Sequence, residues 1–143
     1  MGKVSQILKT KSSVVFSIPP NTIVYNALEI MVEKNVSALL VTEGEKLIGI
    51  FTERDYARKV VLKGKASKEI QIADIMTEYP ITVSPDSTID ECMQLMTNKF
   101  IRHLPVVEGD KLIGIISIGD VVKFIIEDQK FIIEHMEHYI TGS

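Results

Sequence analysis

Two stretches of the sequence place a glycine, a hydroxyl and an acid at the same spacing. They are residues 49–55 (GIFTERD) and residues 114–120 (GIISIGD). A hydroxyl followed three residues later by an acid is typical of a helix capping box, in which the hydroxyl accepts a backbone N–H of the first helical turn. A capping box does not need the glycine three residues before the hydroxyl. Such a glycine lets another group approach the backbone closely, so the motif also suits a binding site.

A phosphorylated ribose would use the same atoms. A helix N-terminus with free N–H groups and a hydroxyl, here Thr52 or Ser117, is a ready site for phosphate. The acid three residues on, here Asp55 or Asp120, can accept hydrogen bonds from two adjacent ribose hydroxyls. The residues therefore allow two interpretations, helix capping alone or nucleotide binding.

Positive charge gathers near the first motif. Arg54 lies between the hydroxyl and the acid and offers a two-pronged contact to phosphate. The second motif has Gly119 at that position, and Arg102 is the expected source of charge there. The other basic residues of segment 54–68 are most simply a solvated helix face and a linker. As a surface for single-stranded nucleic acid this segment has one interleaved aromatic, Tyr56, so we do not expect nucleic acid as a partner.

The sequence lacks the common catalytic motifs. It has no Gly-x-Gly-x-x-Gly, no P-loop, no Gly-x-Ser-x-Gly and no His-Glu-x-x-His. His135 and His138 could share a helix face, but no third ligand stands at matching spacing, which favours a solvated helix flank. Cys92 falls on an apolar helix position and is expected to be a small core residue. We therefore expect no enzyme, no metal and no catalytic cofactor, with a nucleotide hydrolase as the disfavoured alternative.

Composition limits the class of protein further. The chain has 143 residues, a formal net charge of −3 and a mean hydropathy of +0.18. The mildly acidic total disfavours dedicated nucleic-acid binding, and one cysteine cannot form an internal disulfide. No apolar run approaches the ~20 residues that span a bilayer, and the N-terminus does not resemble a signal peptide. We therefore expect a cytoplasmic protein with no membrane partner, whose apolar excess covers an oligomer interface.

The chain contains an internal repeat. Segment 45–61 (EKLIGIFTERDYARKVV) recurs as segment 110–126 (DKLIGIISIGDVVKFII), 65 positions further on. Short leaders before the two copies also match, VSQIL at 4–8 and IADIM at 72–76. A match of this length predicts two copies of one structural unit.

Each copy shows the pattern β-α-β-β-α. An apolar run ends at a proline, a segment with helical spacing follows, two β-rich runs flank a Glu-Gly turn, and a last helix begins at the hydroxyl of the motif. We predict an α/β (α+β) fold in which the copies, residues 1–66 and 67–143, pack sheet to sheet with pseudo-two-fold symmetry. A short leader helix precedes each copy, and a long helix ends the chain.

Three local features complete this expectation. Residues 21–22 and 86–87 are polar and are expected to cap the first helix of each copy. The apolar pattern of the last helix continues to Ile140, with a possible break near residues 128–130. Pro105 lies in a predicted strand, where its missing N–H is expected to leave a neighbouring backbone group free for a ligand.

Together these features resemble a tandem cystathionine-β-synthase (CBS) domain pair, also called a Bateman module. The resemblance covers residues 4–129 and rests on the doubled plan, on both motifs and on RHLPVV at 102–107. More narrowly, TERDYARKVV at 52–61 and ISIGD at 116–120 resemble small stand-alone CBS-pair proteins of bacteria and plant organelles.

The resemblance implies two clefts for adenosine nucleotides between the copies, and modules that stack into flat dimers. In each motif the acid would hold the ribose and the hydroxyl would contact phosphate, while the adenine would lie between the first strand and the hairpin. The residues implied are Asp55 and Asp120 for the ribose, Thr52, Arg54, Arg102 and Ser117 for the phosphate, and Ser17, Ile18, Ala38, Leu39, Thr82, Val83, His103, Leu104 and Pro105 for the adenine.

We therefore expect a non-enzymatic sensor. It would bind AMP, ADP/ATP or an NAD-type nucleotide and act through the geometry of a homodimer on a regulated protein in trans. One alternative is a structural dimerisation module without a ligand, whose motifs are only helix caps. Another is a binder of single-stranded nucleic acid that uses the basic face at 54–68.

Overall fold

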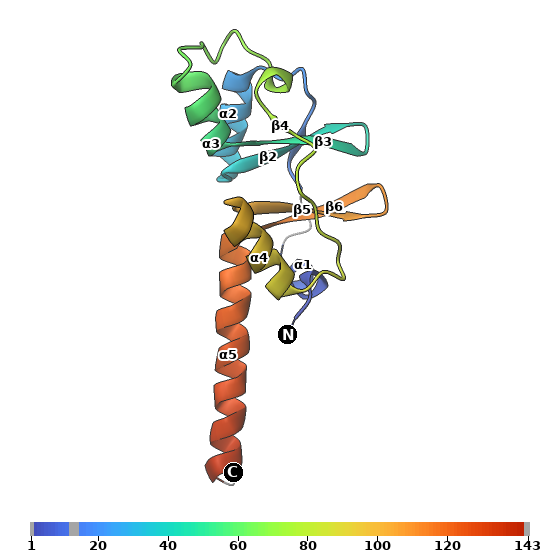
Figure 1. Ribbon diagram of the computed structural model, residues 1–143, viewed down its shortest axis with the longest axis vertical. Coiled ribbons are helices and arrows are strands. Elements are labelled where there is room, and N and C mark those ends of the chain that lie inside the picture. Colours follow the sequence, from blue (N-terminus) through green and yellow to red (C-terminus); the bar gives the residue numbers. More distant parts are fainter. Residues whose placement is uncertain (1, 12–14, 142–143) are drawn as a thin grey trace.

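The computed structural model describes residues 2–11 and 15–141, with side chains described up to residue 138. Two similar units lie one above the other, and a long helix extends from the lower unit (Figure 1). This arrangement confirms the predicted α/β fold of two β-α-β-β-α copies. Within the described residues, none of the helices is long and apolar enough to cross a bilayer.

The upper unit contains a four-stranded sheet in the order β1 (Ser17–Ile18), β2 (Ala38–Glu43), β3 (Lys46–Thr52) and β4 (Thr77–Glu78). β1 pairs parallel with β2, and β2 and β3 form the predicted antiparallel hairpin. Gly44 closes this hairpin with φ +60°, a conformation that glycine adopts without strain. The other elements of this unit are α2 (Val24–Lys34), α3 (Glu53–Asp55) and the π-helical η1 (Tyr56–Val61).

The lower unit repeats this plan in reduced form. The β5–β6 hairpin has the same register as β2–β3, with Gly109 at the turn. The expected first strand shrinks to one parallel bridge, between Val83 and Val106. The elements are α4 (Ile89–Lys99), β5 (His103–Glu108), β6 (Lys111–Ser117) and α5 (Ile118–Thr141).

The two sheets face each other across a small apolar layer. Ala38, Leu40 and Ile50 of the upper sheet are buried there, and Leu112 and Ile115 of β6 pack against them. Period-two alternation places these residues on the faces opposite the helices. The predicted packing of sheet on sheet is therefore confirmed.

The leaders cross between the units. α1 (Val4–Thr10) lies in the lower unit (Figure 1), where Val4 and Ile7 join the buried core around Leu104. The second leader, which contains η2 (Ile72–Asp74) and ends at β4 (Thr77–Glu78), packs in the upper unit instead. The division at residues 66 and 67 thus describes the sequence repeat, whereas each folded core contains a segment from the other side of it.

The polar residues expected to cap the first helix of each copy do not do so. α4 is capped by Thr88, whose Oγ1 accepts from the N–H of Glu91. α2 starts after Ile23 with no side-chain cap, because carbonyls of the linker take its first N–H groups: Val24 donates to Ile70 and Tyr25 to Ser67. The linker therefore replaces the missing cap.

The expected break in the last helix is also wrong, because α5 is continuous from Ile118 to Thr141. Gln129 and Lys130 are good helix formers, and a single Asp costs less than about 0.7 kcal/mol relative to Ala. Residues 128–130 therefore continue the helix.

The crossing of α1 can be tested by truncating its buried side chain. We expect Val4→Ala to lower the free energy of unfolding by about 2 kcal/mol, because Val4 is fully buried in the lower core. Val32→Ala is the matched control, since Val32 also lies in a helix but is 82% exposed. Urea denaturation followed by circular dichroism measures both. Equal losses would contradict the assignment of α1 to the core.

Candidate functional site

The first motif forms a complete capping box at the start of α3. The Thr52 Oγ1 accepts from the N–H of Asp55 at 3.2 Å, and the N–H of Thr52 donates to the Asp55 Oδ2 at 3.0 Å. Capping is therefore a real role of this pair. It uses one oxygen of the carboxylate and leaves the other to be satisfied elsewhere.

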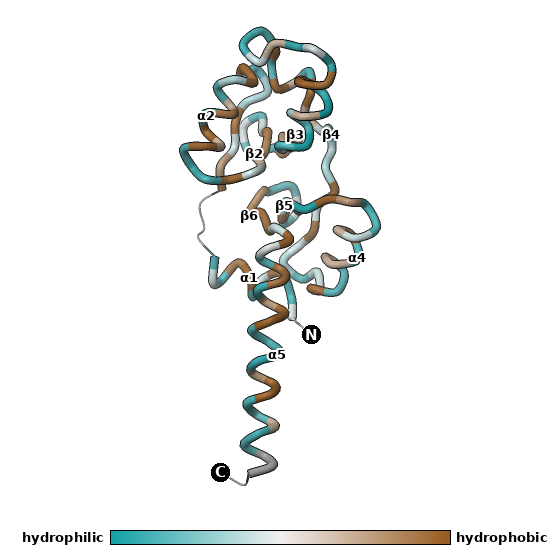
Figure 2. The backbone as a smooth tube through the Cα atoms, turned by 90° about the vertical axis from the view of Figure 1, so that its left-hand side faces the viewer, coloured by the Kyte–Doolittle hydropathy of each residue, from teal (hydrophilic) through white to brown (hydrophobic). Residues whose placement is uncertain are grey.

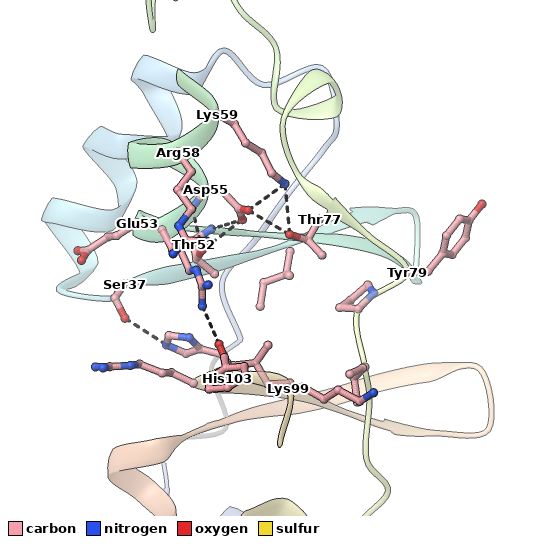
Figure 3. A pocket seen from close by; sticks show the side chains of 17 residues that line it. Ser37, Thr52, Glu53, Asp55, Arg58, Lys59, Thr77, Tyr79, Lys99 and His103 are labelled. Carbon is pink, nitrogen blue, oxygen red and sulfur yellow. Dashed lines mark hydrogen bonds and ion pairs between the residues drawn. The ribbon is translucent and has the colours of Figure 1, made fainter. Parts of the chain in front are cut away.

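The second oxygen of Asp55 contacts the second leader. Oδ1 accepts from the Thr77 hydroxyl at 3.0 Å and lies 3.0 Å from the Lys59 ammonium (Figure 3). Asp55 is 6% exposed, and these partners offset the cost of burying its charge. Thr77 belongs to β4, so the acid of the upper unit is held by a segment that leads into the lower one.

Gly49 makes room for this leader because it has no side chain. A Cβ on Gly49 would lie 2.5 Å from the Met76 sulfur and 3.1 Å from the Thr77 carbonyl oxygen. Gly114 is related in the same way to α1, since a Cβ there would lie 2.9 Å from a Leu8 methyl group. The close approach expected from the motif glycines is thus made by the leaders of the chain itself.

A cleft of about 860 Å³ opens beside Asp55, between the two units (Figure 3). All three arginines of the sequence line it, together with two lysines and two acids, which gives the cleft a positive balance. The lining residues are Ser37, Ile50, Thr52, Glu53, Arg54, Asp55, Arg58, Lys59, Thr77, Tyr79, Pro80, Ile81, Lys99, Phe100, Ile101, Arg102 and His103.

The cleft brings together five residues that the sequence singled out. Thr52, Arg54 and Asp55 come from the upper unit, and Arg102 and His103 from the lower one. Other residues implied for the adenine lie outside it. Ile18, Ala38, Leu39, Val83, Leu104 and Pro105 are buried in the protein, while Ser17 and Thr82 are exposed.

Two hydrogen bonds join the units at this cleft. The Arg54 Nη1 donates to the Phe100 carbonyl at 2.8 Å, and the Ser37 Oγ lies 3.1 Å from the His103 Nε2. Phe100 ends α4 in a left-handed conformation, so the guanidinium satisfies a carbonyl at a helix C-terminus. Burial, and then the nearby charge of Lys11, hold the pKa of His103 below its usual range, which favours the neutral ring.

Sequence reasoning missed most of the wall that the leader supplies. Thr77, Tyr79, Pro80 and Ile81 line the cleft because β4 pairs with β3, and no local signal shows this crossing. Arg58 and Lys59, which the sequence alone suggests as part of a solvated face, also line the cleft. Arg58 lies one α-helical turn after Arg54, and the π-helical turn of η1 brings Lys59 beside it. The spacing of four residues between Arg54 and Arg58 was the available signal, and it applied to Arg58 alone.

Pro105 affects the backbone hydrogen bonding of Ile81, a residue of this wall of the cleft. In the upper unit the N–H of Leu40 donates to the Phe16 carbonyl at 3.3 Å. The equivalent residues of the lower unit are Pro105 and Ile81, and a proline has no N–H to donate. The Ile81 carbonyl cannot receive this hydrogen bond, and Ile81 lines the cleft.

The second motif has a different partner. Its capping box is complete, with Ser117 N–H to Asp120 Oδ2 at 2.8 Å and Asp120 N–H to Ser117 Oγ at 3.1 Å. The Lys11 ammonium lies 2.6 Å from the same Oδ2 and donates to the Ile115 carbonyl at 2.7 Å. Burial alone would raise the pKa of Asp120, but Lys11 and Ser117 outweigh it and hold that pKa below its usual value.

Known proteins share this arrangement. The model of the CBS-domain family matches residues 4–62 and 72–127. The chain belongs to the CBS-domain family. Among solved structures, it is similar to a CBS-domain protein from Burkholderia ambifaria, with 50% identity and a TM-score of 0.85 over 89% of this chain and 96% of that one.

Two other CBS proteins are informative, one for its bound ligand and the other for its greater length. CBSX2 in complex with AMP has 26% identity and a TM-score of 0.75, covering 90% of this chain and 99% of that one. The mitochondrial CBS protein CBSX3 of Arabidopsis thaliana is 43% identical over 124 residues, which is 83% of this chain. The chain spans 60% of the length of CBSX3.

The Lys11–Asp120 pair predicts a defined dependence on pH. Because folding lowers the pKa of Asp120, the pair stabilises the fold above the ordinary value of 3.8 and this stabilisation is lost as the pH falls below it. We expect Lys11→Met to cost about 1–2 kcal/mol at pH 7 and much less at pH 3. Urea denaturation at both pH values measures this, with Lys9→Met on the exposed side of α1 as the control. The same cost at both pH values would contradict the pairing.

Proposed function

We propose that the cleft binds an adenosine nucleotide and that the protein is a non-enzymatic regulatory module. Nucleotide occupancy would be transmitted through a homodimer to a regulated protein in trans. The observation that carries the proposal is the convergence of all three arginines on the cleft that contains Thr52 and Asp55. The structure of CBSX2 with AMP supports a ligand of this class.

The arginines and lysines of the cleft would bind the phosphates. Each guanidinium carries five N–H donors, so Arg54 retains donors beyond the one it gives to Phe100. Arg102 comes from the opposite unit, and a phosphate between them would be held from both sides. Charge of this kind accommodates one phosphate in AMP or several in ADP, ATP and NAD.

The ribose would bind at the Asp55 Oδ1. Thr77 and Lys59 occupy that oxygen, and ribose hydroxyls would replace one of these contacts. The helix cap uses the Oδ2 and is not disturbed. The base would lie against Pro80 and Ile81, with the Ile81 carbonyl available to an amino group.

Binding would change how the two units sit together. A phosphate that draws Arg54 away from the Phe100 carbonyl replaces a contact between the units with a contact through the ligand. A ligand that contacts both units differently in two arrangements shifts their populations, which is the physical basis of a sensor. The cytoplasmic location stays part of this proposal, although CBSX3 is described as mitochondrial.

A structural module without a ligand is the competing function. Both motifs form complete capping boxes, and capping alone would explain Thr52, Asp55, Ser117 and Asp120. Capping does not explain why all three arginines line the cleft.

A thermal-shift panel separates these functions. We expect AMP, ADP, ATP or NAD to raise Tm by several degrees at about 100 times Kd, because ligand binding to the folded state adds about 2.7 kcal/mol at that concentration. Inorganic phosphate and a single-stranded oligonucleotide belong in the same panel. No shift with any adenosine ligand would favour the structural module, and a shift with the oligonucleotide alone would favour nucleic acid.

Variants of the lining residues then test whether the nucleotide binds in this cleft. We expect Arg54→Ala to weaken AMP roughly tenfold to a hundredfold and adenosine far less, because adenosine has no phosphate. We expect Asp55→Asn to weaken both by at least about tenfold, since both carry the ribose. Asp110→Asn is the control, because Asp110 is exposed in the turn between β5 and β6 and does not line this cleft. Isothermal titration measures each affinity, and equal losses of AMP and adenosine in Arg54→Ala would contradict the phosphate role.

A further inference from the structure

α5 extends far beyond the unit that it belongs to. It has 24 residues, which corresponds to about 36 Å, and leaves the lower unit after its first turns (Figure 1). Val121 is fully buried in the lower core, and Phe124 and Ile125 pack against that core. From Ile126 to Met136, by contrast, all of the apolar side chains are largely exposed.

Four of the exposed apolar residues of α5 lie on one stripe, whereas Phe131 and Ile132 lie outside it. Val122, Ile126, Gln129, Ile133 and Met136 follow each other at spacings of four, three, four and three residues. This alternation repeats every seven residues and is typical of the seam between two paired helices. The apolar members are 42%, 50%, 56% and 58% exposed in that order, so the lower unit leaves the seam uncovered. Figure 2 shows apolar and polar residues alternating along the free part of the helix.

We propose that α5 pairs along this seam with α5 of a second copy of the chain. An identical helix offers the same spacing, so its side chains fit between those of the first copy. The seam begins beside the lower core at Val122 and runs about 21 Å to Met136, so the paired surface continues an existing core. Gln129 is the one polar residue of the described seam, and a polar seam residue fixes register at a cost in stability.

The charges of α5 argue against a lipid surface as the partner. Five acids and two lysines lie on the helix, all outside the seam. A helix that lies on an anionic membrane carries lysine and arginine on its polar face. The acidic face of α5 would be repelled there, whereas it stays in water when two copies pair.

The pairing rests on the homodimer of the proposed function and does not involve the nucleotide cleft. The test compares the wild type with the double variant Ile126→Ser/Ile133→Ser by sedimentation velocity at micromolar chain concentration. The matched control is Phe131→Ser, because Phe131 lies on the same helix at 60% exposure but off the seam. We expect the wild type and the control at twice the chain mass of 16.0 kDa and the double variant at the single-chain mass.

Three results would overturn the pairing: a monomeric wild type, a double variant that keeps the wild-type mass, or a control that dissociates equally. Gln129→Leu adds a test that does not depend on loss of structure, because removing the polar seam residue should tighten association. Weaker association of Gln129→Leu would also overturn it. The shift of Tm with AMP is also measured on the double variant, whose cleft is intact. This measurement distinguishes a failure of the pairing from a failure of nucleotide binding.

Discussion

Neither CBS unit completes its core without a segment from the other side of the repeat. Val4 and Ile7 of α1 close the lower core, and Ile72 and Ile75 close the upper one. A unit of about 60 residues buries only about 60% of the surface that its unfolded chain exposes and is marginal alone, so each contributed side chain matters. The second leader and the residues that follow it also form a wall of the cleft, so the crossing that completes the cores contributes to the site as well.

The same crossing explains why capping and binding need not exclude each other at Asp55. Its Oδ2 caps α3, and its Oδ1 receives Thr77 from β4, which approaches because Gly49 has no side chain. One oxygen therefore maintains the fold while the other faces partners that a ligand can exchange. At Asp120 the cap and the Lys11 ammonium converge on a single oxygen, so the two motifs differ in chemistry despite their equal spacing.

Local patterns were sufficient for the plan of each unit and for the packing of their sheets, but not for the exchange of leaders or for the cleft wall. The repeat, the hairpins at Gly44 and Gly109 and the packing of sheet on sheet follow from periodicity and turn chemistry, and Cys92 is buried as expected. The leader exchange and the cleft wall at Thr77–Ile81 depend on contacts between distant residues, which no local spacing encodes. The caps expected at residues 21–22 and 86–87 were wrong because the linker and Thr88 satisfied those helix ends.

The exchange of leaders also governs the order in which the chain can fold as it is synthesised. The upper core lacks Ile72 and Ile75 until the second leader has left the ribosome, although β1 to β3 end at Thr52. The lower core must wait longer still, because α1 cannot pack until its partners in β5, β6 and α5 have been synthesised. Such closure over most of the chain is slow and favours folding of both units as one cooperative body after synthesis.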